Sequence, residues 1–93
     1  MKKITMLKMQ GCPYCAKAYQ AIEELCAENP AYKDVKVEFI DENEEPEKAK
    51  VYAKDYYYLP SLFVEGKKIY EAHPGDDYDT IKAAVVKAFA AAE

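Results

Sequence analysis

Two cysteines, separated by two residues, are the part of this sequence best suited to chemistry. They are Cys12 and Cys15, in the run Gly11-Cys12-Pro13-Tyr14-Cys15. A short apolar run, 4–7, precedes them, and a helical pattern, 16–28, follows. The thiolate is the reactive form of cysteine, and free N–H groups at a helix N-terminus stabilise an anion. We therefore expect Cys12 to be the reactive thiolate. Cys15, about one helical turn later, would attack a mixed disulfide formed on Cys12.

The rest of the chain predicts strands and helices in the order β-α-β-α-β-β-α. Val35, Val37 and Phe39 alternate with charged residues, which is typical of a strand, and a helix joins this strand to the first one. Such a unit is typical of parallel strands. The charged run 41–45 predicts a solvated loop. The expected strands are 2–7, 35–40, 61–64 and 68–70, and the expected helices are 13–28, a stretch from Pro46 to Tyr56, and one that begins after Asp76 or Asp77.

Three short motifs, taken together, resemble a known family. Cys-Pro-Tyr-Cys after a first strand resembles the active site of dithiol glutaredoxins, which belong to the thioredoxin superfamily. Leu59-Pro60, followed by the apolar run 62–64, is similar to the cis-proline segment of that family, and Gly75-Asp76-Asp77 is similar to its last helix start. The resemblance implies an α/β, thioredoxin-like (glutaredoxin) fold with a four-stranded mixed sheet and helices on both faces. The length of 93 residues predicts one small domain, 1–93, with a single core.

The resemblance also implies a function. Cys12 and Cys15 would be the catalytic dithiol of a glutathione-dependent thiol–disulfide oxidoreductase. It would reduce protein disulfides and glutathione mixed disulfides. Glutathione would be a co-substrate, with no tightly bound cofactor, and the partners would be disulfide-containing or glutathionylated proteins. The residues implied for binding substrate and glutathione are Lys8, Tyr14, Leu59, Pro60, Gly75, Asp76 and Asp77.

The resemblance implies a role for several of these binding residues. A cis bond at Pro60 would turn the backbone of Leu59 toward the active sulfur, where it pairs with an extended peptide or with glutathione. The N–H groups around 75–77 would hold the γ-glutamyl end of glutathione at a helix N-terminus. Asp77 could accept a hydrogen bond from the ammonium group of the same end.

Several features depart from the family pattern and leave an alternative with the same fold. Pro74-Gly75 stands where Gly-Gly is usual, and Lys8 is one position further from Cys12 than the usual basic residue. The stretch 60–75 is longer than in typical glutaredoxins and closer to a thioredoxin hairpin, although the chain has no tryptophan. The alternative is a thioredoxin-like disulfide reductase that is itself reduced by thioredoxin reductase.

Composition bears on other classes of protein. A net charge of −4 argues against nucleic acid as a partner, and no apolar run is long enough for a membrane span. We expect a cytoplasmic monomer. A metal- or iron–sulfur-binding module remains a second alternative, although one cysteine pair supplies only two of the usual four ligands and His73 is distant in sequence. We expect no resident metal, and we expect Cys26 to be a buried, inert thiol of the first helix.

Overall fold

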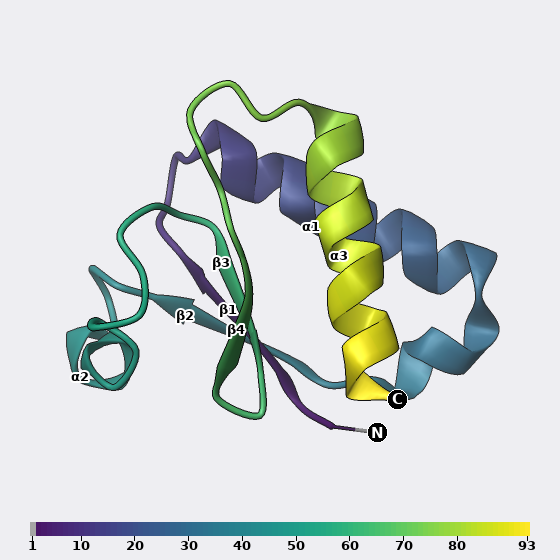
Figure 1. The fold of residues 1–93 in the computed structure, drawn as a ribbon, viewed down its shortest axis with the longest axis horizontal. Coiled ribbons are helices and arrows are strands. Elements are labelled where there is room, and N and C mark those ends of the chain that lie inside the picture. The colour runs from purple at the N-terminus through teal and green to yellow at the C-terminus, as the bar shows by residue number, and fades with distance from the viewer. Residues whose placement is uncertain (1) are drawn as a thin grey trace.

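A four-stranded sheet with strand order β2-β1-β3-β4 organises residues 2–93, the part of the chain that this computed structural model describes (Figure 1). Strand β1 (Ile4–Lys8) pairs in parallel with β2 (Val37–Asp41) and antiparallel with β3 (Ser61–Val64). Strand β4 (Lys67–Glu71) lies at the other edge, antiparallel to β3. The protein is therefore a small α/β protein with a mixed sheet, as predicted.

Helices cover both faces of the sheet because β1 and β3 are apolar on both sides. Ile4 and Met6 face the larger core, which includes helices α1 (Pro13–Glu28) and α3 (Tyr78–Ala92). Leu7 faces a smaller core, in which Ala49 of helix α2 (Pro46–Lys50) is buried. Successive strand residues point to opposite faces, so alternate residues of one strand supply both cores. Figure 1 shows α1 and α3 together on one side of the sheet and α2 on the other.

The boundaries of the strands differ slightly from the prediction. β1 and β2 each begin two residues later than expected and end one residue later, at Lys8 and Asp41. The predicted hairpin is present, and its two connecting residues, Glu65 and Gly66, have φ values of 50° and 83°. A two-residue hairpin whose twist matches the strands needs such positive φ values, which glycine adopts at little cost.

The second helix is shorter than its apolar pattern predicted. α2 ends at Lys50, and turns replace the expected continuation to Tyr56. The N–H groups of Tyr52, Ala53 and Asp55 donate to carbonyls three residues earlier, so the α-helical ladder of four-residue steps is not continued. Tyr52 and Tyr56 still pack on the smaller core, which explains why their spacing looked helical.

Helix α1 begins and ends as its sequence predicted. Pro13 is its first residue, where a missing N–H costs no hydrogen bond. Asn29 ends the helix, and its side chain accepts a hydrogen bond from the Ala31 N–H to start a 3-10 helix, η1 (Pro30–Asp34). This short helix was not predicted.

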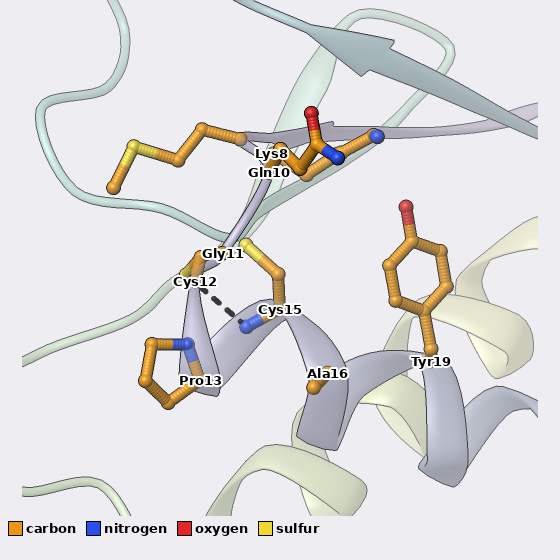
Figure 2. Close-up of a pocket in the computed structure, with 9 residues that line it drawn as sticks. Lys8, Gln10, Gly11, Cys12, Pro13, Cys15, Ala16 and Tyr19 are labelled. Carbon is orange, nitrogen blue, oxygen red and sulfur yellow. Dashed lines mark hydrogen bonds between the residues drawn. The ribbon is translucent and has the colours of Figure 1, made fainter.

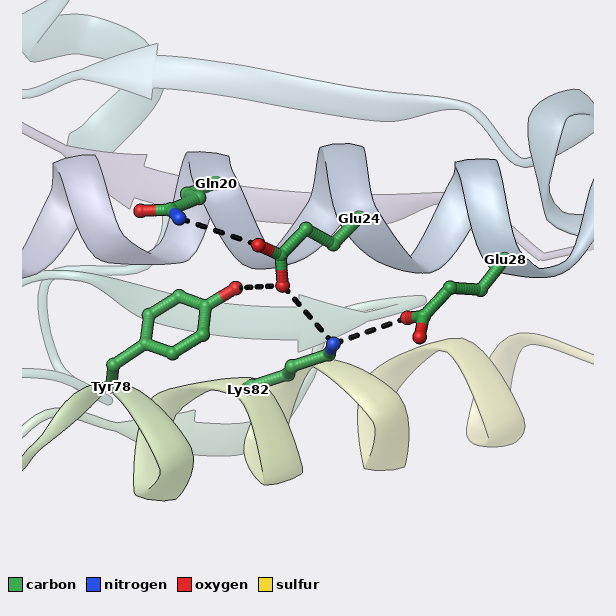
Figure 3. A network of polar contacts seen from close by, with 5 residues as sticks. All are labelled: Gln20, Glu24, Glu28, Tyr78 and Lys82. Carbon is green, nitrogen blue, oxygen red and sulfur yellow. Dashed lines mark hydrogen bonds and ion pairs between the residues drawn. The ribbon is translucent and has the colours of Figure 1, made fainter.

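Polar contacts tie α1 to α3 along their solvent side (Figure 3). Lys82 of α3 forms ion pairs with Glu24 and Glu28 of α1, each with an N–O distance of 3.1 Å. The Tyr78 hydroxyl donates to Glu24 as well, and Gln20 donates to its other oxygen. Glu24 is therefore the centre of a network that fixes the start of α3 against α1.

Replacing Glu24 with glutamine is expected to lower the urea midpoint near neutral pH. Hydrogen bonds from Tyr78 and Lys82 hold the pKa of Glu24 below its ordinary value. A carboxylate of this kind stabilises the fold above its unfolded-state pKa and loses that contribution as pH falls through its folded-state pKa. The difference in urea midpoint between the variant and the wild type should therefore become smaller below about pH 4. Urea unfolding at several pH values, followed by circular dichroism, measures this difference.

Glu23→Gln is the matched control, because Glu23 is an exposed neighbour with no ion pair to any of residues 2–93. It should unfold like the wild type at each pH. If the Glu24→Gln protein is less stable than the wild type by the same amount in acid as at neutral pH, the stabilisation does not come from a charged Glu24.

Candidate active site

The two cysteines of the Cys-Pro-Tyr-Cys run lie at the junction between β1 and α1. Cys12 is the N-cap residue of α1, and its sulfur accepts a hydrogen bond from the Cys15 N–H at 3.2 Å (Figure 2). The first N–H groups of a helix have no carbonyl partner within the helix, so the sulfur fills the role that a capping oxygen usually has. The Cys12 sulfur, and not that of Cys15, therefore lies at the N-terminal end of the helix, where the free N–H groups point.

Cys15 has a different environment. It is 2% exposed, against 8% for Cys12. Burial raises the pKa of the Cys15 thiol to about 12, and the Cys12 sulfur adds to the rise by hydrogen bonding and charge. Two other contacts lower the pKa of Cys15: a hydrogen bond with the Met9 backbone and the positive charge of Lys8. The two thiols are thus unequal, and Cys12 is the better placed to react first.

The segment before β3 lies against the Cys12 sulfur. The Leu59–Pro60 peptide bond is cis, in agreement with the expectation drawn from the resemblance. The Cys12 thiol donates a weak hydrogen bond to the Leu59 carbonyl, with a distance of 3.9 Å from Sγ to O. Leu59 is half-buried and Pro60 is buried. The structure therefore brings together residues that are 47 positions apart in the sequence.

One carboxylate anchors the loop that precedes Leu59. Glu71 of β4 accepts hydrogen bonds from the N–H groups of Tyr57 and Tyr58, each at 2.7 Å, and pairs with Lys68 at 2.9 Å. Burial alone would raise the pKa of Glu71, but these hydrogen bonds outweigh it and lower the pKa to about 2. The Ser61 hydroxyl donates to the Tyr58 carbonyl at 2.7 Å. Nothing in the local sequence pattern marked Glu71, because its partners lie in a distant loop.

A pocket of about 420 Å³ lies beside the sulfurs, between the loop after β1 and the first turns of α1 (Figure 2). Its lining includes Lys8, Cys12, Cys15 and Tyr19. Of the residues that the structure describes, none from the segments 59–60 and 75–77 lines this pocket. The resemblance grouped Lys8 with those segments, whereas the structure places Lys8 beside Cys15.

Lys8 has a buried partner. The carboxylate of Asp41, 4% exposed, lies 3.5 Å from the Lys8 ammonium because the two residues are register partners on β1 and β2. Asp41 also accepts hydrogen bonds from the N–H groups of Asn43 and Glu44, and these lower its pKa. The prediction of a solvated loop over 41–45 is thus wrong for Asp41, whose charge is satisfied inside the fold.

For Lys8 itself, burial alone would lower the pKa. The facing Tyr19 hydroxyl and the Asp41 carboxylate outweigh that effect and raise it. Figure 2 shows the polar ends of Lys8 and Tyr19 near one another. A positive charge is therefore kept near the more buried thiol.

The third predicted segment, 75–77, contacts the active-site run through Tyr14. The Tyr14 hydroxyl accepts a hydrogen bond from the Gly75 N–H at 2.9 Å. Asp77 is the N-cap of α3 and accepts from the Thr80 N–H at 2.8 Å. Asp76 accepts from the Tyr70 hydroxyl at 2.6 Å and from the His73 N–H. Among the groups expected to bind glutathione, the Gly75 and Asp76 N–H groups and both carboxylates thus have partners within the protein.

Comparison with known proteins adds no family. No family model matches the chain, and no curated protein matches it. None of the helices within 2–93 is long and apolar enough to cross a membrane. Over the same residues, no three side chains of His, Cys, Asp or Glu lie close enough to hold a metal ion. Cys26 is half-buried, and its thiol donates to the Tyr32 carbonyl at 3.6 Å.

Limiting iodoacetamide is expected to modify Cys12 before Cys15. Burial raises the pKa of Cys15 to about 12, so at a given pH this residue carries much less thiolate than an ordinary cysteine. Cys15 is also less exposed than Cys12, which slows its reaction further. Peptide mass mapping of timed samples of a Cys26→Ala protein measures the order without the third thiol. Faster labelling of Cys15 than of Cys12 would show that the two roles are reversed.

Replacing Glu71 with glutamine is expected to cost about 2 kcal/mol of unfolding free energy near neutral pH, because hydrogen bonds to a charged acceptor are lost. The folded-state pKa of about 2 lies below the unfolded value, so the contribution exists above about pH 4.5 and disappears as pH falls toward 2. Chemical denaturation of both proteins across this range measures the difference, with Glu23→Gln again as control. Equal stability at neutral pH would contradict the anchoring role.

Proposed function

We propose that this chain is a thiol–disulfide oxidoreductase with a thioredoxin-like, glutaredoxin-type fold. The observation that carries the proposal is the Cys12 sulfur at the start of α1, which accepts the Cys15 N–H and lies against the Leu59 carbonyl. The strand order β2-β1-β3-β4 supports the fold assignment. A dithiol held in this way is suited to exchanging disulfides.

In the first step, the Cys12 thiolate attacks one sulfur of a substrate disulfide. A bond forms between Cys12 and that sulfur, the substrate S–S bond breaks, and the other substrate sulfur leaves as a thiolate that takes a proton from water. The backbone of Leu59, beside Cys12, is placed to pair with the extended chain that carries the disulfide.

In the second step, Cys15 attacks the Cys12 sulfur of the mixed disulfide. Part of the rise in the Cys15 pKa comes from the free Cys12 sulfur, so forming the mixed disulfide removes that part. The Lys8 charge stays in place and favours loss of the Cys15 proton to solvent. The Cys15 thiolate then forms a Cys12–Cys15 disulfide and releases the substrate as a thiolate. The substrate gains two electrons and the protein loses two.

We propose glutathione as the electron donor, with two molecules restoring the dithiol and forming glutathione disulfide. A one-cysteine branch follows from the same chemistry. Cys12 takes the glutathionyl group from a mixed disulfide, and a second glutathione removes it. The proposed setting is a reducing compartment such as the cytoplasm, and the proposed partners are disulfide-containing or glutathionylated proteins.

A protein donor such as thioredoxin reductase is the second candidate. It is favoured by the internal hydrogen bonds at Gly75, Asp76 and Asp77, the groups that the resemblance assigns to glutathione. A reductase would need both thiols, because it acts on the Cys12–Cys15 disulfide.

Serine variants of the two cysteines test the proposal. Cys12→Ser is expected to lose all exchange, because no thiolate remains at the start of α1. Cys15→Ser is expected to keep turnover of a small glutathione mixed disulfide and to lose most reduction of protein disulfides, which needs the resolving thiol. Coupled assays offering glutathione with its reductase, or thioredoxin reductase, measure both activities. Cys26→Ala is the control and should behave as the wild type.

Turnover by Cys12→Ser would contradict the assignment of the nucleophile. If neither the wild type nor Cys15→Ser turns over glutathione mixed disulfides while thioredoxin reductase supports the wild type, the second candidate replaces glutathione. Absence of exchange with either donor would remove the proposed function. Visible absorbance and metal analysis of fresh protein test the metal-binding alternative in the same preparation.

A further inference from the structure

The backbone of Leu59, beside the Cys12 sulfur, has hydrogen-bonding groups that the fold leaves open. Its carbonyl accepts a weak hydrogen bond from the Cys12 thiol, at 3.9 Å from Sγ to O. Its N–H has no acceptor among residues 2–93, although the residue is half-buried. Backbone donors in folded proteins are nearly always paired, with protein or with water. Leu59 therefore offers one donor and one acceptor next to the reacting sulfur.

The residues on either side of Leu59 have the opposite arrangement, because the end of β4 binds their backbone groups. The Glu71 carboxylate accepts both N–H groups of 57–58 through one oxygen, Oε2, at 2.7 Å each. The Ala72 N–H donates to the Pro60 carbonyl at 3.1 Å. Two consecutive residues, the last of β4 and the one after it, thus hold the chain before and after Leu59.

The Glu71 carboxylate is well suited to holding this segment. Its other oxygen, Oε1, pairs with the Lys68 ammonium at 2.9 Å, so the two oxygens have separate partners. Its pKa is lowered to about 2, so the group is charged at neutral pH. Hydrogen bonds to a charged acceptor are roughly twice as strong as neutral ones. Two such bonds from consecutive N–H groups restrict the backbone just before Leu59.

We propose that Glu71 is a positioning residue for polypeptide substrates, because it holds the Leu59 backbone where an extended segment can pair with it during attack by Cys12. This inference rests on the proposed thiol–disulfide exchange at Cys12. A polypeptide disulfide carries amides that can bond the Leu59 N–H and carbonyl. A small disulfide without amides cannot use these groups. Glu71 therefore favours polypeptide disulfides over small ones without touching either.

The test uses Glu71→Ala and Lys68→Met, which separate the two oxygens of the carboxylate. Glu71→Ala removes the acceptor of both N–H groups, whereas Lys68→Met removes only the ion pair at Oε1. The probes are bis(2-hydroxyethyl) disulfide and a cysteine-containing peptide joined to mercaptoethanol by a disulfide. Each is mixed with reduced protein in a single turnover without an electron donor. Acid quenching and mass spectrometry give the second-order rate constants.

The measured quantity is the ratio of the rate constant for the peptide probe to that for the small probe. Losing one hydrogen bond to the substrate is expected to lower this ratio about fivefold in Glu71→Ala. Lys68→Met should keep the wild-type ratio. Glu71→Gln retains an acceptor oxygen and should recover part of the difference. It also replaces Glu71→Ala if the alanine variant does not fold, and it should then show a smaller fall.

A second readout examines the pairing itself. The Cys15→Ser protein is joined through Cys12 either to the peptide or to mercaptoethanol. Hydrogen exchange of the Leu59 amide, measured by NMR, should be several-fold slower in the peptide adduct than in the mercaptoethanol adduct. Adding Glu71→Ala, or Glu71→Gln if that protein does not fold, should reduce this difference.

Three results would overturn the inference. They are an unchanged ratio in the Glu71 variant, an equal fall of the ratio in Lys68→Met, and equal Leu59 exchange in the two adducts. The proposed function stands in each case as long as the wild type forms a mixed disulfide at Cys12. If the wild type reacts with neither probe, the proposed function fails and the inference fails with it.

Discussion

The first turn of α1 has N–H groups that no helical carbonyl can accept, and the sulfur of Cys12 accepts one of them from Cys15. This contact is local, since it needs only a strand that delivers Cys12 and a helix that starts at Pro13. It also makes the two thiols different, because the residue that donates its N–H carries the more buried sulfur. The inequality on which the proposed chemistry depends thus has two sources, the helix start at Cys12 and the packing that buries Cys15.

The remaining parts of the site come from the sheet. β1 carries the loop that ends at Cys12, and β3 pairs with β1 so that Leu59 and Pro60, just before β3, reach the same end of the molecule. β2 pairs with β1 on its other side and places Asp41 opposite Lys8. The central strand therefore organises a backbone carbonyl on one side of the dithiol and a fixed charge on the other.

Local features of this protein could be predicted well from the sequence, and long-range polar contacts could not. The start of α1 at Pro13, its end at Asn29 and the hairpin at Gly66 follow from residue types at particular positions. The length of α2 was overestimated because Tyr52 and Tyr56 face a core without continuing a helix. The burial of Asp41 depends on the strand register, which the pattern of a single strand does not specify.

The same limit applies to the candidate site. Cys12, Cys15 and the cis bond before Pro60 were found from motifs. The contact between Tyr14 and Gly75 joins residues 61 positions apart, and Glu71 acts on a loop 13 positions earlier, so neither leaves a periodic signal. Lys8 was noticed as a charge, but its place in the pocket that Cys15 also lines is a property of the folded sheet.

The edge strand β4 carries a consequence for the behaviour of the protein in concentrated solution. It lies at one edge of the sheet, and it opens with two exposed lysines, Lys67 and Lys68. A second copy that paired along this edge would have to strip water from their ammonium groups. The lysines therefore oppose continuation of the sheet from one molecule into the next.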